Sequence, residues 1–281
     1  MKLQVTQENL SKALNNVAKI AMANKNPLPI LSNVILKTID NRLNISATNL
    51  EIAISEKIGS KIKTEGSITV PARLMQEYIS SLPSGVIDLE LDEFKLHIST
   101  DQYSSTINGV IADDFPDIPT VEDGVKWSIP AKEFKKGLSQ VVFAASNDES
   151  RPVLTGVLLH VVDGKLYAAA TDSYRLSEKE LIKTKQDISL LVPASALHEL
   201  LRIIPDTAEN IDVFADKQQV LFVVDDIELV SKLIDANYPD YRKLIPKKFE
   251  VTAKLARDEF IAITKVSSLF ARESAGSITI K

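Results

Sequence analysis

The chain has 281 residues, a formal net charge of −5, 44% hydrophobic and 25% charged residues, proportions that are ordinary for a globular protein. It contains no cysteine, which excludes disulfides and cysteine nucleophiles and fits the cytosol, so we expect a cytoplasmic protein. No apolar run reaches the about 20 residues of a membrane span, and the first residues lack the apolar core of a signal peptide. The negative net charge argues against a uniformly basic nucleic-acid binder, but it allows charges that are segregated onto separate faces.

The chain opens with the pattern of a strand followed by an amphipathic helix. Met1–Val5 alternates as a strand does, and Thr6 is a suitable N-cap. The helix that follows has an apolar stripe, with lysines on another face. The stripe comprises Leu10, Leu14, Val17 and Ala21, and the lysines are Lys12 and Lys19.

Short strands and a second helix complete the first pattern. Turn residues such as Asp40-Asn41 separate the strands. The strands are predicted at Val34–Thr38, Leu43–Ala47, Ile52–Ile58, Ile87–Leu91 and Lys95–Ser99. The helix starts after Val70-Pro71 because proline is favoured in the first turn. Its apolar face is Leu74, Met75, Tyr78, Ile79 and Leu82, and Arg73 is its cation.

The same order of elements returns about 123 residues later, which indicates an internal repeat. Pro29 and Thr48 correspond to Pro152 and Thr171. The first helix returns with the apolar residues Phe134, Leu138, Val141 and Ala145 and the lysines Lys132 and Lys136. The second helix returns with Leu197, Leu200, Leu201 and Ile204, and with Arg202 as its cation. Strands are predicted at Gly156–Val161, Leu166–Ala170, Ile211–Phe214 and Val220–Val224, with Asp163-Gly164 as a two-residue hairpin turn.

A third copy begins at Glu259-Phe260 and stops after a single helix and strand. Its inward candidates are Phe260, Ile263, Ser267 and Phe270, and its cations are Arg257 and Lys265. Roughly 85–90 residues of a full copy are missing by this count, so we expect a chain truncated within its third domain. A lone helix and strand do not form a stable sheet, so we expect weak or absent dimerisation. The predicted organisation is α+β with mainly antiparallel sheets, with domains at 1–122 and 123–247 and a fragment at 248–281.

Three functional hypotheses follow from the residues alone. A metal-dependent phosphoryl transfer enzyme would need converging carboxylates, but the acidic pairs Asp113-Asp114, Asp148-Glu149 and Asp225-Asp226 lie in turn-like segments. The sequence has no phosphate loop, no nucleophile elbow and no zinc spacing among its histidines, so we expect no catalytic residues, metal or cofactor. A peptide-binding scaffold would use the loop with Tyr174 and Arg175, since both residue types are favoured binding anchors. The cationic helix faces, repeated along the chain, favour a third hypothesis, binding to DNA.

The motifs together resemble those of the bacterial DNA sliding clamps, the beta subunit of the replicative DNA polymerase III holoenzyme. The motifs are Leu-Pro-Ile-Leu at 28–31, Val-Pro-Ala-Arg at 70–73, Phe-Pro-Asp at 115–117, Ala-Thr-Asp-x-x-Arg-Leu at 170–176 and Tyr-Pro-Asp-Tyr-Arg-x-Leu-Ile-Pro at 238–246. The resemblance implies a head-to-tail homodimer that closes a ring around duplex DNA, with helices lining the hole. Such a ring is a non-catalytic processivity factor in DNA replication, an accessory subunit of a DNA-directed DNA polymerase. It slides because contacts to the DNA backbone carry no sequence information.

The resemblance also assigns roles to particular residues. It implies double-stranded DNA contacts by the helix cations and by a residue before the Leu-Pro-Ile motif, namely Lys12, Lys19, Lys25, Arg73, Lys132, Lys136, Arg202, Arg257 and Lys265. It implies a cleft for short peptides of the polymerase and the clamp loader, with a wall of Leu154, Thr171, Tyr174, Arg175, Leu176 and Pro246. Ser173 stands where the family frequently has Gly. Ring closure would join Ile107 to Leu269 and Phe270 of the partner.

Overall fold

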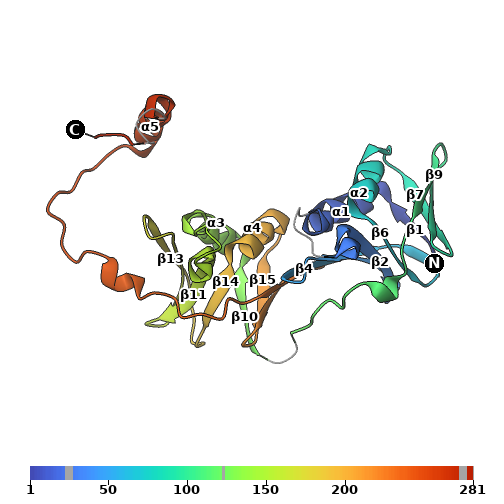
Figure 1. Ribbon diagram of the computed structural model, residues 1–281, viewed down its shortest axis with the longest axis horizontal. Coiled ribbons are helices and arrows are strands. Elements are labelled where there is room, and N and C mark those ends of the chain that lie inside the picture. The colour runs from blue at the N-terminus through green and yellow to red at the C-terminus, as the bar shows by residue number, and fades with distance from the viewer. Residues whose placement is uncertain (23–27, 122–123, 272–276, 281) are drawn as a thin grey trace. The chain divides into compact units, whose positions relative to one another are not determined.

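The computed structural model describes residues 1–22, 28–121, 124–271 and 277–280. The chain divides into two compact units, Met1–Tyr238 and Pro239–Lys281, which are considered separately. The first unit contains both complete copies of the repeat (Figure 1). Among the described residues, no helix is long and apolar enough to cross a membrane.

In the described part of the first copy there are two helices and nine strands. The helices are α1 (Gln7–Ala21) and α2 (Ala72–Ser81). The strands are β1 (Lys2–Thr6), β2 (Asn33–Ile39), β3 (Arg42–Thr48), β4 (Ile52–Gly59), β5 (Lys61–Thr64), β6 (Ser67–Pro71), β7 (Val86–Asp92), β8 (Lys95–Ser99) and β9 (Ser104–Asn108). Every strand predicted in this copy is present, and β5, β6 and β9 are additional.

The second copy has the same plan without a counterpart of β5. The helices are α3 (Ala131–Ser139) and α4 (Ala194–Ile203). The strands are β10 (Val125–Pro130), β11 (Gly156–Val162), β12 (Lys165–Thr171), β13 (Leu176–Lys183), β14 (Ser189–Pro193), β15 (Asn210–Ala215), β16 (Gln219–Val224) and β17 (Ile227–Lys232). The four strands predicted here are confirmed, and β10, β13, β14 and β17 are additional.

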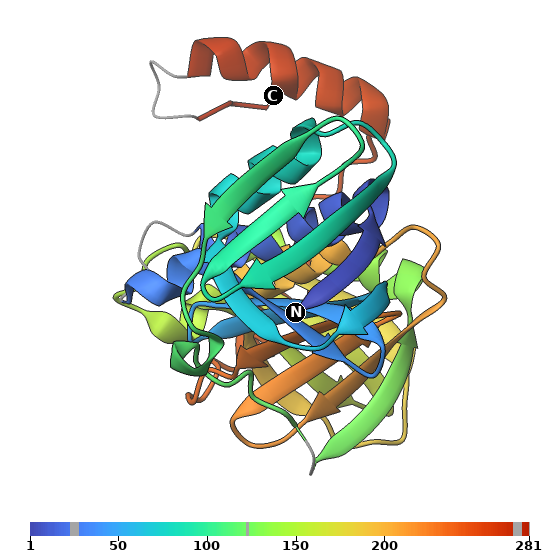
Figure 2. The ribbon, with the colours of Figure 1, turned by 90° about the vertical axis from the view of Figure 1, so that its right-hand side faces the viewer.

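Strand pairing shows that the two copies share one topology. In the first copy β1 pairs with β7, β7 with β8 and β8 with β9, and in the second β10, β15, β16 and β17 pair in the same order, all antiparallel. The strands β6, β2, β3 and β4 likewise correspond to β14, β11, β12 and β13. Figure 2 shows β7–β9, teal to green, side by side across the front of the first copy.

The copies are joined through a common sheet. Strand β17 of the second copy pairs antiparallel with β4 of the first, with Leu229 opposite Ile54. This pairing produces an eight-stranded sheet in the order β10-β15-β16-β17-β4-β3-β2-β6. Because the ladder crosses from one copy to the other, the joint is held by backbone hydrogen bonds as well as by side chains.

Two hairpin turns have the backbone geometry that their residues predict. Asp40 and Asn41 have φ of 49° and 58°, and Asp163 and Gly164 have φ of 51° and 71°. Positive φ at both central residues is the type I′ pattern, whose twist matches that of the flanking strands. The Asp163-Gly164 prediction is therefore confirmed.

The helices bury the stripes that the sequence predicts, with a few differences. The α1 stripe is at most 2% exposed, and Thr6 Oγ1 accepts a hydrogen bond from the Asn9 N–H at 3.4 Å, as an N-cap should. Leu74, predicted to face inward, is 52% exposed, since the buried face of α2 is formed by Ala72, Met75 and Ile79. Pro71 is the N-cap of α2 rather than a residue of its first turn.

The repeat of the first helix is shorter than the pattern suggests. Helix α3 ends at Ser139, and the chain continues in a 3-10 turn at Val142–Ala144. Val141 and Ala145 are nonetheless buried, so the apolar positions are preserved without a continuous helix. Phe134 of α3 packs against Phe222 of β16, with ring centroids 6.2 Å apart.

The second unit consists mainly of helix α5 (Arg257–Ala271). The prediction that Ile263 and Phe270 face inward is wrong, since Ile263 is 54% exposed and Phe270 is 76% exposed. A helix buries an apolar face only against another element, and α5 leaves most of its large apolar side chains in solvent.

Candidate functional site

The described cations of the first unit that are predicted to contact DNA lie on helices that share one side of it. Figure 1 shows α1, α2, α3 and α4 above the strands β2, β4, β14 and β15. The buried stripes of these helices face the sheets, so the cations point away from them. The exposed ones are Lys12 and Lys19 on α1, Arg73 on α2, and Lys132 and Lys136 on α3, whereas other exposed lysines, such as Lys61 and Lys63, lie on strands. Lys25, the remaining predicted contact of the first copy, lies outside the described residues.

Arg202 has a different environment from the other predicted contacts. Its guanidinium donates to the backbone oxygens of Asn15 at 3.0 Å and Asn16 at 2.6 Å, both on α1 of the first copy. It also forms an ion pair with Glu199 at 2.6 Å, and its side chain is only 22% exposed. Arg202 therefore connects α4 of one copy to α1 of the other.

A buried carboxylate lies near the same joint. Glu56 on β4 is 6% exposed and accepts a hydrogen bond from Asn16 Nδ2 at 2.9 Å. Burial raises the pKa of Glu56, against the opposing influence of Asn16 and Lys12. A polar pocket of about 250 Å³ adjoins it, and the ion pair of Arg42 with Asp226, at 2.6 Å, is part of the pocket wall.

The two copies close the gap between their helices differently. In the first copy, Gln76 of α2 donates to Asn15 of α1 at 2.7 Å, and Ser11 and Ser80 lie 3.2 Å apart. In the second copy, Lys135 and Arg202 stand at the positions of Ser11 and Ser80. Because Lys135 and Arg202 are both positively charged, they do not form a contact between α3 and α4 like that between Ser11 and Ser80.

The cationic pair of the second copy leaves an open groove. Lys135 Nζ binds the Ile204 oxygen at 3.0 Å and Asp206 at 2.8 Å. A groove of about 410 Å³ remains between α3 and α4, with Lys132, Lys136 and Leu201 among its lining residues. The second copy thus presents lysines around an apolar floor where the first copy is closed.

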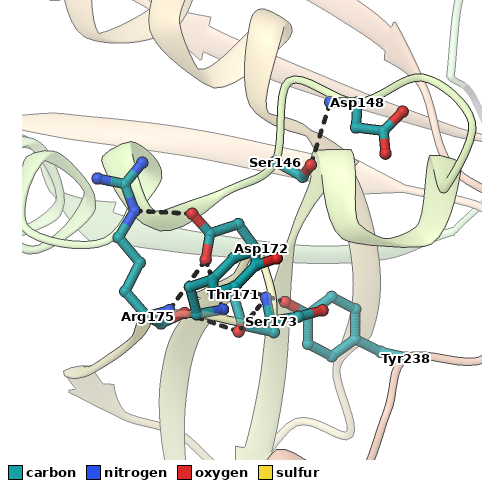
Figure 3. Close-up of polar contacts among 8 residues, drawn as sticks. Ser146, Asp148, Thr171, Asp172, Ser173, Arg175 and Tyr238 are labelled. Carbon is teal, nitrogen blue, oxygen red and sulfur yellow. Dashed lines mark hydrogen bonds and ion pairs between the residues drawn. The ribbon is translucent and has the colours of Figure 1, made fainter. Parts of the chain in front are cut away.

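The loop between β12 and β13 is built around Thr171 and Asp172 (Figure 3). Thr171 Oγ1 donates to the Arg175 oxygen at 2.7 Å and accepts from the Ser173 N–H at 3.1 Å. Asp172 Oδ1 accepts from the backbone N–H groups of Tyr174 and Arg175, both at 2.9 Å. These backbone bonds, that of Arg175 first, lower the pKa of Asp172.

The first copy contains the same loop with different side chains. Thr48 Oγ1 donates to the Ile52 oxygen at 3.1 Å, and Asn49 Oδ1 accepts from the N–H groups of Glu51 and Ile52. Leu50 and Ser173 occupy the same position with φ of 74° and 78°. The place where the family frequently has Gly therefore has the left-handed backbone that Gly favours, and here Ser173 adopts it.

The loop of the second copy presents its anchors to solvent. Tyr174 is 95% exposed and Leu176 is 37% exposed. Arg175 forms an ion pair with Asp172 at 3.0 Å and lies over the Phe143 ring, 5.5 Å from its centroid. These side chains are available to a ligand that offers apolar and acidic groups.

The other predicted cleft residues have supporting or separate positions. Leu154 and Thr171 are buried, so their side chains present little surface to a ligand. Pro246 belongs to the second unit and is exposed there. Sequence reasoning did not identify Arg151, whose Nη1 donates to Ser173 Oγ at 3.2 Å, or Tyr238, whose hydroxyl contacts Thr171.

The ring-closure residues also have different environments. Ile107 lies on β9, at one end of the five-stranded sheet, but its side chain is 3% exposed. Any contact of Ile107 with a partner must therefore use its backbone. Leu269 and Phe270 on α5 are 65% and 76% exposed, and Arg257 and Lys265 of this helix are exposed as well.

The carboxylate pairs lie in separate turns. Asp113 and Asp114 are in a 3-10 turn, and Asp225 and Asp226 connect β16 to β17. Asp148 accepts from the Ser150 N–H at 3.0 Å and pairs with Arg151 at 3.3 Å. Over residues 1–22, 28–121, 124–271 and 277–280, no three acidic or histidine side chains gather as a metal site.

Tandem copies of one α+β module, joined through a shared sheet and with exposed lysines along helices on one side, define a clamp-type protein. The models of the N-terminal and central domains of the DNA polymerase III beta subunit match residues 1–119 and 128–240. The beta sliding clamp of Bacillus subtilis is 31% identical over 99% of this chain and 76% of its own length. That of a Staphylococcus epidermidis strain is 30% identical, also over 99% and 76%.

Solved structures agree with these relatives. The sliding clamp structure from Bacillus subtilis has a TM-score of 0.89 and 29% identity, covering 97% of this chain and 75% of that one. A Pseudomonas aeruginosa sliding clamp bound to griselimycin has a TM-score of 0.83 and 27% identity, covering 89% and 69%. The chain belongs to the family of bacterial DNA polymerase III beta sliding clamps, which are processivity factors.

Proposed function

We propose that this chain contributes to a head-to-tail dimeric ring that encircles duplex DNA, slides along it and is itself non-catalytic. The proposal depends above all on one observation: α1 and α3, at equivalent positions of two joined copies, expose lysines on the same side of the unit. Phosphate contacts of this kind hold DNA without reading its sequence. The proposed DNA contacts are Lys12, Lys19, Lys25, Arg73, Lys132, Lys136, Arg257 and Lys265. Arg202 is better explained as a joint residue.

Retention on closed DNA tests the ring. A full-length version of the chain is incubated with a bacterial clamp loader, ATP and nicked circular DNA, and the protein–DNA complex is isolated by gel filtration. We expect the full-length version to remain on the circle at a salt concentration that removes it from linear DNA, and to leave once the circle is cut. Equal loss from circular and linear DNA would contradict encirclement.

We also propose that the loop from Thr171 to Leu176 is one wall of a cleft for partner peptides of the polymerase and clamp loader. Exposed Tyr174, Arg175 and Leu176 supply the contacts, and Leu154 and Thr171 support them. Griselimycin, bound in a structure of a similar clamp, is a suitable probe. Tyr174→Ala should weaken its binding at least about tenfold, as truncation of a binding anchor does, whereas exposed Tyr103→Ala should not.

We propose that dimerisation uses the β9 edge through the backbone of Ile107, together with Leu269 and Phe270 of the partner. The exposed apolar side chains on α5 support an interface there. The proposed division is a first domain at 1–122, a second at 123–247 and part of a third at 248–281, in keeping with the spans of the two family models. Sedimentation velocity of the chain and of a Leu269→Ser/Phe270→Ser variant, over a range of concentrations, tests the interface. A dimer that is unaffected by the substitutions would contradict these contacts.

A further inference from the structure

The two Thr-Asx loops differ in what covers their outer strand. In the first copy β17 pairs along β4, and the Lys232 N–H donates to the Glu51 oxygen at 2.9 Å, within the loop itself. In the second copy, β13 is the terminal strand of its sheet among the described strands. The second loop therefore has the same backbone shape without the neighbouring strand that holds the first.

A tyrosine supports the second loop instead. The Thr171 N–H donates to Tyr238 Oη at 3.0 Å, and Figure 3 shows the ring beside the loop. Thr171 is 9% exposed, so its N–H needs a protein partner. In the first copy the matching residue of the Phe/Tyr-Pro-Asp motif is Phe115, which has no hydroxyl.

The Tyr238–Thr171 hydrogen bond involves the same residue, Thr171, whose side chain makes the hydrogen bonds that shape the loop. Thr171 Oγ1 connects to Ser173 and Arg175, and Arg151 reaches Ser173 Oγ. Ser173 has a φ of 78°, a conformation that a non-glycine residue keeps only when its surroundings enforce it. Burial raises the pKa of Tyr238 to about 12, so its hydroxyl remains protonated at neutral pH.

We propose that Tyr238 is a positioning residue for the partner-binding loop, acting through its hydroxyl on the Thr171 N–H. The hydroxyl holds Thr171, Thr171 holds Ser173 in its left-handed conformation, and Tyr174 and Leu176 are thereby presented to a peptide. The role in peptide binding depends on the cleft proposed above, whereas the role in loop order does not.

Amide exchange measures loop order independently of any ligand. Exchange rates are compared by NMR for the unaltered chain, Tyr238→Phe, Tyr238→Leu and the control Tyr103→Phe, which removes a hydroxyl from an exposed side chain. Loss of one hydrogen bond should speed exchange of Thr171 and Ser173 about 2- to 10-fold in both Tyr238 variants. Leu159, in the core of β11, should exchange at the unaltered rate in the Phe variant.

The comparison of Phe with Leu separates the hydroxyl from the ring. If only ring packing mattered, Phe would behave like Tyr and Leu alone would be defective, and that result would overturn the proposal. Unchanged exchange in both variants would overturn it as well.

Griselimycin titration then tests the consequence for binding. Tyr238→Phe should weaken binding about 2- to 10-fold, while Tyr103→Phe leaves it unchanged. Faster exchange with unaltered affinity would overturn the binding role of Tyr238. Failure of the unaltered chain to bind griselimycin would instead contradict the proposed cleft, and the exchange rates would still decide the role of Tyr238 in loop order.

Discussion

Arg202 makes a structural contact that its residue type alone does not predict. A cation on an amphipathic helix predicts a phosphate contact, but here the fork of the guanidinium spans two backbone oxygens of another helix. A lysine keeps the charge and loses that fork. Arg202→Lys should therefore cost about 1–2 kcal/mol of stability in urea denaturation and leave affinity for duplex DNA unchanged. Unaltered stability with weaker DNA binding would support the phosphate contact instead.

Glu56 gives a pH-dependent prediction at the same scale. Its pKa is raised in the fold, so the folded state binds the proton more tightly than the unfolded state. The tighter binding of this proton stabilises the folded state at pH values below the ordinary glutamate pKa of 4.5. That stabilisation is lost as the pH rises through the pKa that Glu56 has in the fold. Glu56→Gln should raise the melting temperature at about pH 7 and have little effect near pH 4. Exposed Glu77→Gln is the control, and an equal effect at both pH values would contradict the burial argument.

At the scale of elements, the lysines of α3 give a measurable salt dependence. Each phosphate contact contributes about 0.9 to the slope of log K against log salt concentration. Lys132→Gln/Lys136→Gln should therefore reduce the slope for duplex DNA by nearly 2. Lys61→Gln/Lys63→Gln on β5 changes the net charge equally, away from the helices, and should leave the slope unchanged. Equal effects of the two pairs would show that only total charge matters.

At the scale of the whole molecule, the shared sheet should make the first unit unfold cooperatively. Ile54 is fully buried on β4 of the first copy, opposite Leu229 of the second. Trp127, the single tryptophan, is buried in β10 and reports on the second copy. Ile54→Ala should lower the free energy of unfolding by about 2–5 kcal/mol. The denaturation midpoints measured by Trp127 fluorescence and by circular dichroism should therefore fall together. Two separated transitions would show that the copies unfold independently.

Periodic patterns predicted most of the regular structure, and for local reasons. The α1 stripe, the Thr6 cap and the Asp163-Gly164 turn depend on residues within a few positions of one another. Strands β5, β6, β9, β10, β13, β14 and β17 were not predicted, because their segments carry little of the alternating pattern and form by pairing with distant strands. Helix α5 shows the reverse, since its apolar pattern is present while most of its apolar side chains stay exposed.

The sequence by itself determined the repeat, the α+β class, the sliding clamp family and the loop that contains Tyr174 and Arg175, because motifs and their spacing are properties of the chain. Only the tertiary structure decided that β17 continues the sheet of the first copy, that Arg202 spans the joint, and that the Tyr238 hydroxyl contacts Thr171. Each of these contacts joins residues more than about 60 positions apart, and such pairings depend on how distant segments meet in the folded chain.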